Sequence, residues 1–169
     1  MARVLVGCVG NIFKGDDAFG VEVAARLARR AVPDGVRVVD YGIRSVHLVY
    51  ELLDGYDALV LVDTVGQQEG QAGSLYVIEP ELPARRREDD TVLPEVMLDP
   101  HDLAPAGAMS LVTTLGGQVD RIIVVGCQPE TLEDGIGLSD AVAAVVETAA
   151  DLVLDVAARE VARVEHTNA

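Results

Sequence analysis

Residues 4–21 read VLVGCVGNIFKGDDAFGV and join an apolar run to a helical pattern through a glycine-rich turn. The apolar run at 4–9 is typical of a buried strand, and it ends at glycines. Two acids follow, Asp16 and Asp17, before apolar residues that recur at helical spacing. Ligands in open α/β sheets bind outside the carboxyl ends of the strands, so this turn is the first candidate for a functional site.

The turn does not have the pattern of a phosphate-binding loop. No Gly-Lys-Ser/Thr follows its glycines, and Gly7, Gly10 and Gly15 miss the dinucleotide spacing G-x-G-x-x-G. Two carboxylates at a helix start would also repel a phosphate. A helix N-cap role fits Asp16 as well as a functional role does. A second adjacent cap would be redundant, which favours a functional role for Asp17.

Length and composition favour one α/β domain. The chain has 169 residues, half of them hydrophobic, so we expect a single domain over 1–160 and a frayed tail at 161–169. The formal charge of −15 argues against binding to nucleic acid or to anionic membranes. No apolar run is long enough to span a membrane.

The two cysteines indicate a reducing compartment. Cys8 and Cys127 each end an apolar run, form no CxxC motif, and follow no signal-peptide pattern. We therefore expect free thiols and a cytoplasmic protein.

Strand-like and helix-like segments alternate along the chain. The strand patterns lie at 3–9, 36–40, 58–63, 74–78 and 121–127, and the helix patterns at 18–31, 45–53, 102–115 and 139–158. This order predicts a three-layer α/β/α sandwich around a five-stranded, mostly parallel but mixed sheet. The polar connection at 66–73 is too short for a crossover helix, which favours antiparallel pairing of the strands at 58–63 and 74–78.

The segment 79–100 is the least regular part of the chain. It contains four of the seven prolines and the charged run Arg85-Arg86-Arg87-Glu88-Asp89-Asp90. This composition is typical of a solvated surface loop, and a lid over a substrate is the alternative.

Three acids are placed alike at the ends of successive strands. Asp17 follows the first strand, Asp40 ends the second and Asp63 ends the third, so parallel strands would bring them to one edge of the sheet. Such acids are costly unless they are paired, capped or bound to metal. Two carboxylates and one imidazole suit nickel or zinc, and His101 lies in a loop flanked by structure-breaking residues. Their wide spacing carries no metal signal by itself, so capping and plain loop roles remain alternatives.

The sequence does not identify a nucleophile. The G-x-S-x-G motif of serine hydrolases is absent. Cys8 could act as a nucleophile, but nothing in the sequence places a base beside it.

An ordered set of motifs supports a family resemblance. The motifs are GNIFKGDDAFGV at 10–21, VVDYG at 38–42, LVLVD at 59–63, PHDL at 100–103, GCQPE at 126–130 and GIGLS at 135–139. Together they resemble the nickel-iron hydrogenase maturation endopeptidases over roughly residues 3–157.

The resemblance implies a fold, a reaction and a site. The fold is the same α/β/α sandwich, and the enzyme is an aspartyl-type endopeptidase. Its partner is the precursor of a nickel-iron hydrogenase large subunit, from which it removes a carboxy-terminal extension after nickel insertion. The implied nickel ligands are Asp17, Asp63 and His101, and the nickel is the one held by the substrate. Asp40 is a further catalytic candidate, for positioning or general-base work.

Some positions depart from the family pattern. Many members carry Glu at the position of Asp17 and Gly at that of Cys8, and their Asp-Gly-Gly-Thr segment is Asp40-Tyr41-Gly42-Ile43-Arg44 here. Arg44 is a candidate contact for the substrate tail or a plain surface residue. A non-cleaving, metal-binding chaperone of the precursor is the alternative function, and we expect a monomer.

Overall fold

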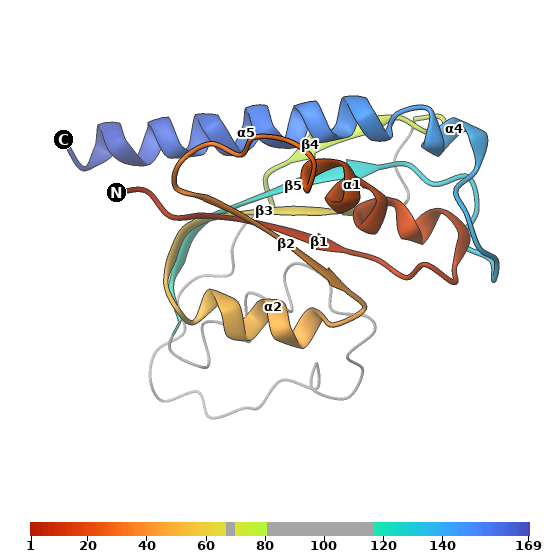
Figure 1. Ribbon diagram of the computed structural model, residues 1–169, viewed down its shortest axis with the longest axis horizontal. Helices are drawn as coiled ribbons and strands as arrows, with labels where there is room; N and C mark the ends of the chain where they lie inside the picture. Colours follow the sequence, from red (N-terminus) through yellow and green to blue (C-terminus); the bar gives the residue numbers. More distant parts are fainter. Residues whose placement is uncertain (67–69, 81–116) are drawn as a thin grey trace.

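The computed structural model describes residues 1–66, 70–80 and 117–169 (Figure 1). Its strands are β1 (Val4–Val9), β2 (Val36–Gly42), β3 (Tyr56–Thr64), β4 (Leu75–Ile78) and β5 (Val119–Cys127). Its helices are α1 (Phe19–Leu27), α2 (Ser45–Leu52), α4 (Asp140–Ala143) and α5 (Val146–Thr167), with a short 3-10 helix at Gly15–Ala18 before α1.

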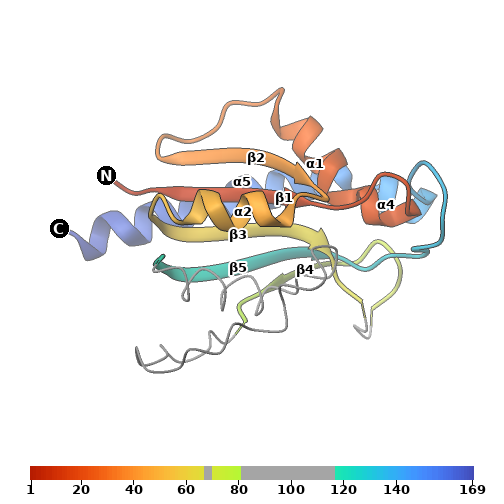
Figure 2. The ribbon, with the colours of Figure 1, turned by 90° about the horizontal axis from the view of Figure 1, so that it is seen from below.

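The sheet is mixed, as the sequence predicts. Its strand order is β2-β1-β3-β5-β4, which Figure 2 shows from one side of the sheet to the other. β1 pairs in parallel with β2 and β3, and β3 pairs in parallel with β5. β4 alone is antiparallel, and its partner is β5. The carboxyl ends of the four parallel strands therefore meet at one end of the molecule.

The expected pairing of the strands at 58–63 and 74–78 is wrong. Both edges of β3 are taken by long apolar strands, β1 and β5, so β4 adds to the outer edge of β5. The connection passes the end of β5, where Val65 N–H donates to the carbonyl of Cys127 at 3.0 Å. Gln128 N–H then donates to the carbonyl of Ser74 at 2.9 Å.

Helices cover both faces of the sheet and form the outer layers of the sandwich. Figure 1 shows α1 and α5 on one face and α2 on the other. Every residue of β1 is buried because both of its faces are covered. Val6 packs with α1 and α5 in one apolar cluster, whereas Leu5 packs with α2 in the second.

The carboxy-terminal helix differs from the prediction at both ends. The pattern at 139–158 predicts one helix, but the chain forms α4, breaks, and restarts as α5. The expected fraying of 161–169 is also wrong, since α5 continues to Thr167. Val164 is buried and Val161 packs against the core, which holds this last part of the helix in place.

Two other expectations concern helices. The helix expected at 102–115 lies outside the described residues. Among the described residues, no helix is both long enough and apolar enough to cross a bilayer.

Candidate active site

Glycines bring α1 directly onto the ends of two strands. A Cβ at Gly20 would meet the carbonyl oxygens of Val9 and Val62, which end β1 and nearly end β3. A Cβ at Gly10 would likewise run into the carbonyl oxygen of Asp17. The missing side chains allow this close approach of backbone to backbone. As a result, the turn before α1 lies against the carboxyl ends of the central strands.

Asp17 and Asp63 meet at this edge through Thr64. Oδ1 of Asp17 accepts a hydrogen bond from the Thr64 hydroxyl at 3.2 Å, and its Oδ2 accepts one from Asn11 N–H at 3.1 Å. Oδ1 of Asp63 accepts from Thr64 N–H at 2.7 Å. Thr64 therefore contacts both carboxylates, and we call Asp17 and Asp63 the acid pair.

The acid pair has unfavourable electrostatics. The pKa of Asp63 is raised from 3.8 to about 7, mainly because the carboxyl is shielded from water and also because Asp17 is close. Hydrogen bonds from Thr64 act in the opposite direction but do not outweigh burial. Two carboxylates held in this way gain from a bound proton or a bound cation. The pair is thus chemically suited to supplying two oxygen ligands to a metal.

Asp16 has a structural role that differs from an N-cap. It is fully buried and accepts hydrogen bonds from Glu130 N–H at 2.8 Å, from Thr131 N–H at 3.1 Å and from Ser139. Burial alone would raise the pKa of Asp16, but these hydrogen bonds lower it below 3.8 overall. The capping interpretation of Asp16 is therefore wrong. The two adjacent acids serve opposite sides: Asp16 holds the 130–139 segment, and Asp17 faces β3.

Asp40 is at the same edge but stands apart from the acid pair. It is exposed, and its Oδ1 accepts from Gly42 N–H at 2.9 Å. Its register partner in β1 is Cys8. Among the hydrogen bonds of the described residues, none joins Asp40 to Asp17 or Asp63. Its catalytic role stays a prediction.

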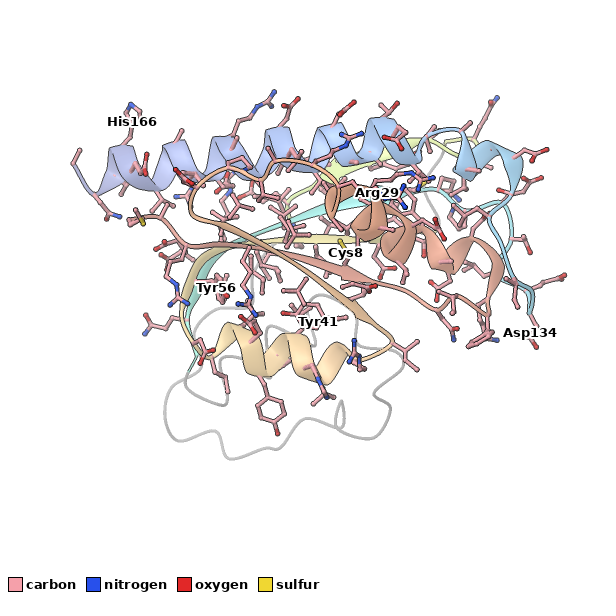
Figure 3. The ribbon with its side chains drawn as sticks, viewed as in Figure 1. Cys8, Arg29, Tyr41, Tyr56, Asp134 and His166 are labelled. Carbon is pink, nitrogen blue, oxygen red and sulfur yellow. The ribbon has the colours of Figure 1, made fainter. Side chains whose placement is uncertain are left out.

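The cysteines are free and buried, as expected. Burial, together with the charge of Asp40, raises the pKa of the Cys8 thiol to about 12. Figure 3 shows Cys8 inside the molecule, beside α1. A buried thiol that stays protonated is a poor nucleophile, so the structure argues against nucleophilic catalysis by Cys8.

The expected third ligand, His101, lies outside the described residues, as does the charged run at 85–90. The histidines that the structure does describe, His47 and His166, are both exposed. Figure 3 shows His166 at the carboxyl end of α5, at the opposite end of the molecule from Asp134. Within the described ranges, no three His, Cys, Asp or Glu side chains gather as a metal cluster. The acid pair is thus the part of the predicted ligand set that the structure describes.

Sequence reasoning missed Thr64 and the role of Asp16. Thr64 directly follows a strand-ending acid, a position from which its hydroxyl and N–H can reach neighbouring carboxylates. That adjacency is the one signal that could have indicated it. The partners of Asp16 lie 114 to 123 positions away, so no local spacing could have predicted them.

Fold and site together define an α/β/α protein with an acidic site at the carboxyl ends of its parallel strands. A solved structure with this fold is the hydrogenase maturating endopeptidase HybD from Escherichia coli, with a TM-score of 0.72, 30% identity and 91% of each chain covered. Another is a hydrogenase 2 maturation peptidase from a Thaumarchaeota archaeon, with a TM-score of 0.66 and 30% identity over 91% of this chain and 97% of that one.

Sequence comparisons agree with the structural ones. The chain is 31% identical over 153 residues to the hydrogenase 2 maturation protease of Escherichia coli K12, covering 90% of this chain and 88% of that protein. A family model described as hydrogenase maturation protease matches residues 21–156. The chain belongs to the hydrogenase maturation protease family, which confirms the resemblance and the class of enzyme, a peptidase.

Proposed function

We propose that this protein removes the carboxy-terminal extension of a nickel-iron hydrogenase large subunit after nickel has been inserted. The family supports a peptidase that acts in hydrogenase maturation. The observation that carries the proposal is the acid pair, Asp17 and Asp63, joined by Thr64 at the edge of the sheet. The relatives are named as proteases, so the comparisons do not favour the alternative function, a non-cleaving chaperone of the precursor.

The acid pair fits a metal that arrives with the substrate. Nickel held in the large subunit would gain oxygen ligands from Asp17 and Asp63, and an imidazole from His101 completes the proposed set. Thr64 and Asn11 N–H fix the carboxylates before the substrate binds. Such preorganisation lowers the entropy cost of recognition. Only a subunit that already contains nickel would then bind productively, and the bound nickel would orient the extension in the site.

The cleavage step uses groups at the same edge. Nickel bound to the acid pair can polarise the scissile carbonyl or a water molecule. Asp40, exposed at the end of β2, is available to position the substrate or to accept a proton. The fully buried and hydrogen-bonded Asp16 supports the geometry and takes no part in proton transfer.

The proposal also covers the setting of the reaction. The partner is the large-subunit precursor, and the enzyme acts as a monomer. Two buried free thiols suit a reducing cytoplasm, which is where we place the reaction.

Intact mass spectrometry tests the proposal directly. The protein is incubated with nickel-loaded and with nickel-free large-subunit precursor, and we expect loss of a carboxy-terminal peptide from the loaded form alone. Asp17→Asn, Asp63→Asn and His101→Ala should each abolish cleavage. Asp120→Asn, which changes an exposed acid at the opposite end of the sheet, is the matched control and should cleave normally.

Three results would contradict the proposal. If nickel-free precursor were cleaved at the same rate as nickel-loaded precursor, the metal would have no role in recognition. Normal cleavage by Asp63→Asn would show that the acid pair is not needed for the reaction. A stable complex with the loaded precursor, without any loss of mass, would instead identify a non-cleaving chaperone.

A further inference from the structure

Two loops from distant parts of the chain are joined beside the acid pair. The first follows β1 and the second follows β5. Gly135 N–H donates to the carbonyl of Phe13 at 2.9 Å, and Gly15 N–H donates to the carbonyl of Gly135 at 3.0 Å. Asp16 N–H donates to the carbonyl of Thr131 at 3.0 Å. Figures 1 and 2 both show these loops side by side at the end of the molecule where the parallel strands finish.

These joined loops expose large apolar side chains. The exposed fraction is 62% for Phe13 and 85% for Ile136, whose neighbour Gly135 is bonded to Phe13. Ile12 and Leu132 are also exposed. We call these four residues the paired-loop patch. A group of exposed apolar side chains in adjoining loops is typical of a protein–protein interface. Exposed apolar residues without such a role are usually scattered singly over the surface.

The loops of the patch are joined to the acid pair by hydrogen bonds. Asp16 holds the second loop with hydrogen bonds from Glu130, Thr131 and Ser139. Asn11, next to Ile12, donates its N–H to Asp17. A partner seated on the patch would therefore lie directly beside the acid pair, and little ordering would be needed when it binds.

Acidic side chains lie next to the apolar residues in the second loop. Glu130, Glu133 and Asp134 are exposed in the second loop, and Figure 3 shows Asp134 at this end of the molecule. Lys14 is the base within the joined loops, and it is paired with Asp134 at 2.9 Å. An apolar centre with an acidic border matches a partner surface that is apolar at its centre and basic around it.

We propose that the paired-loop patch is the docking surface for the large-subunit precursor, and that it binds an apolar, basic-bordered face next to the nickel site of that subunit. This inference rests on the proposed function. It adds the surface that holds the precursor while the acid pair binds the nickel of the precursor. Apolar anchors such as Phe13 and Ile136 would supply most of the affinity, while the acidic border would speed association.

Steady-state cleavage of nickel-loaded precursor tests the patch. The double variant Phe13→Ser with Ile136→Ser should raise KM by about tenfold or more with little change in kcat, because interface anchors are lost and the acid pair is intact. Tyr50→Ser is the matched control, since Tyr50 is 61% exposed on α2 and lies outside the patch. It should keep the wild-type KM. Unfolding midpoints confirm that both variants fold.

A charge variant provides a second measurement. Glu133→Lys should raise KM at low salt, and it should weaken the dependence of KM on ionic strength. A wild-type KM in both the double variant and Glu133→Lys would overturn the docking surface while leaving the proposed function intact.

Direct binding separates failure of the docking surface from failure of the function. If the wild-type protein binds the loaded precursor without cleaving it, and the double variant binds more weakly, the docking surface stands and the cleavage proposal fails. If the wild-type protein neither binds nor cleaves, both proposals fail.

Discussion

Asp16 accepts both the backbone N–H and the hydroxyl of Ser139, at 2.7 and 2.9 Å, although the two residues are 123 positions apart. This contact fastens the turn after β1 to the segment that leads into α4. Ser139 also caps α4 by accepting a hydrogen bond from Val142 N–H. The acid pair and the paired-loop patch both depend on this junction, since Asp17 and the residues of the patch flank it.

Asp16→Asn should destabilise the protein markedly. The amide turns a donor toward N–H groups that need an acceptor and removes charge-assisted hydrogen bonds, so we expect a loss of about 2–4 kcal/mol in the free energy of unfolding. Urea denaturation measures it. Asp134→Asn is the control, because its surface ion pair with Lys14 contributes less than about 1 kcal/mol. Equal losses in both variants would show that the buried hydrogen bonds of Asp16 carry no special weight.

The same contact predicts a pH dependence. Hydrogen bonding lowers the pKa of Asp16 below 3.8, so the folded state favours its ionised form. The resulting stability is fully present above pH 3.8 and is lost as the pH falls through the lower pKa of the folded state. The stability difference between the wild-type protein and Asp16→Asn should therefore be constant from pH 5 to 7. It should shrink below pH 3.8, and a difference that grows with acid would contradict this assignment.

Much of the fold could be predicted because its strands are continuous apolar runs. The runs that became β1 and β3 are buried on both faces, and a run of that kind points to the centre of a parallel sheet whatever the rest of the chain does. The neighbour of β4 could not be predicted in this way, because edge pairing depends on which strand edges remain open after the centre has formed. The end of α5 was missed because Val161 and Val164 find their partners only in the folded core.

The candidate site was partly predictable for a similar reason. Parallel strands bring their carboxyl ends together, so acids such as Asp17 and Asp63 could be placed at one edge from their positions alone. The link through Thr64 and the buried contacts of Asp16 depend on side-chain directions, which sequence spacing does not encode. A sequence pattern treats Asp16 and Asp17 alike as carboxylates, so it could not predict that the two have different roles.

Asp63→Asn should stabilise the metal-free protein while it abolishes processing. Burial raises the pKa of Asp63 to about 7, so the folded state disfavours the ionised carboxylate, and the wild-type protein loses stability as the pH rises from 3.8 through about 7. Asparagine keeps an acceptor for Thr64 N–H without the charge. We expect the melting temperature of the variant to exceed that of wild type by about 3 °C or more at pH 8. The gain should be smaller at pH 5.

Asp57→Asn is the comparison for this prediction. Asp57 lies at the start of the same strand and accepts a hydrogen bond from Arg3 N–H. Its replacement should give no gain at pH 8. A lower melting temperature of Asp63→Asn at pH 8 would show that the acid pair is not electrostatically strained.

Cys8→Ala should leave processing intact. Burial and Asp40 raise the pKa of the thiol to about 12, so the fraction present as thiolate at neutral pH is negligible. We expect a stability cost of about 1 kcal/mol for the lost packing, with unchanged kcat for cleavage of the nickel-loaded precursor. Iodoacetamide should also fail to inhibit the folded wild-type enzyme. Loss of cleavage in a variant that still folds would restore Cys8 as a candidate nucleophile.

Gly20→Ala should damage both stability and processing, because it pushes α1 away from the strand ends. The added Cβ would meet the carbonyl oxygens of Val9 and Val62, which are backbone atoms and cannot rotate aside. We expect a loss of about 3 kcal/mol and a slower cleavage rate at a temperature where the variant is folded. Gly135→Ala is the control, since a Cβ there meets nothing within 4 Å. Equal urea midpoints and equal cleavage rates in the two variants would show that the close approach of α1 to β1 and β3 matters for neither stability nor processing.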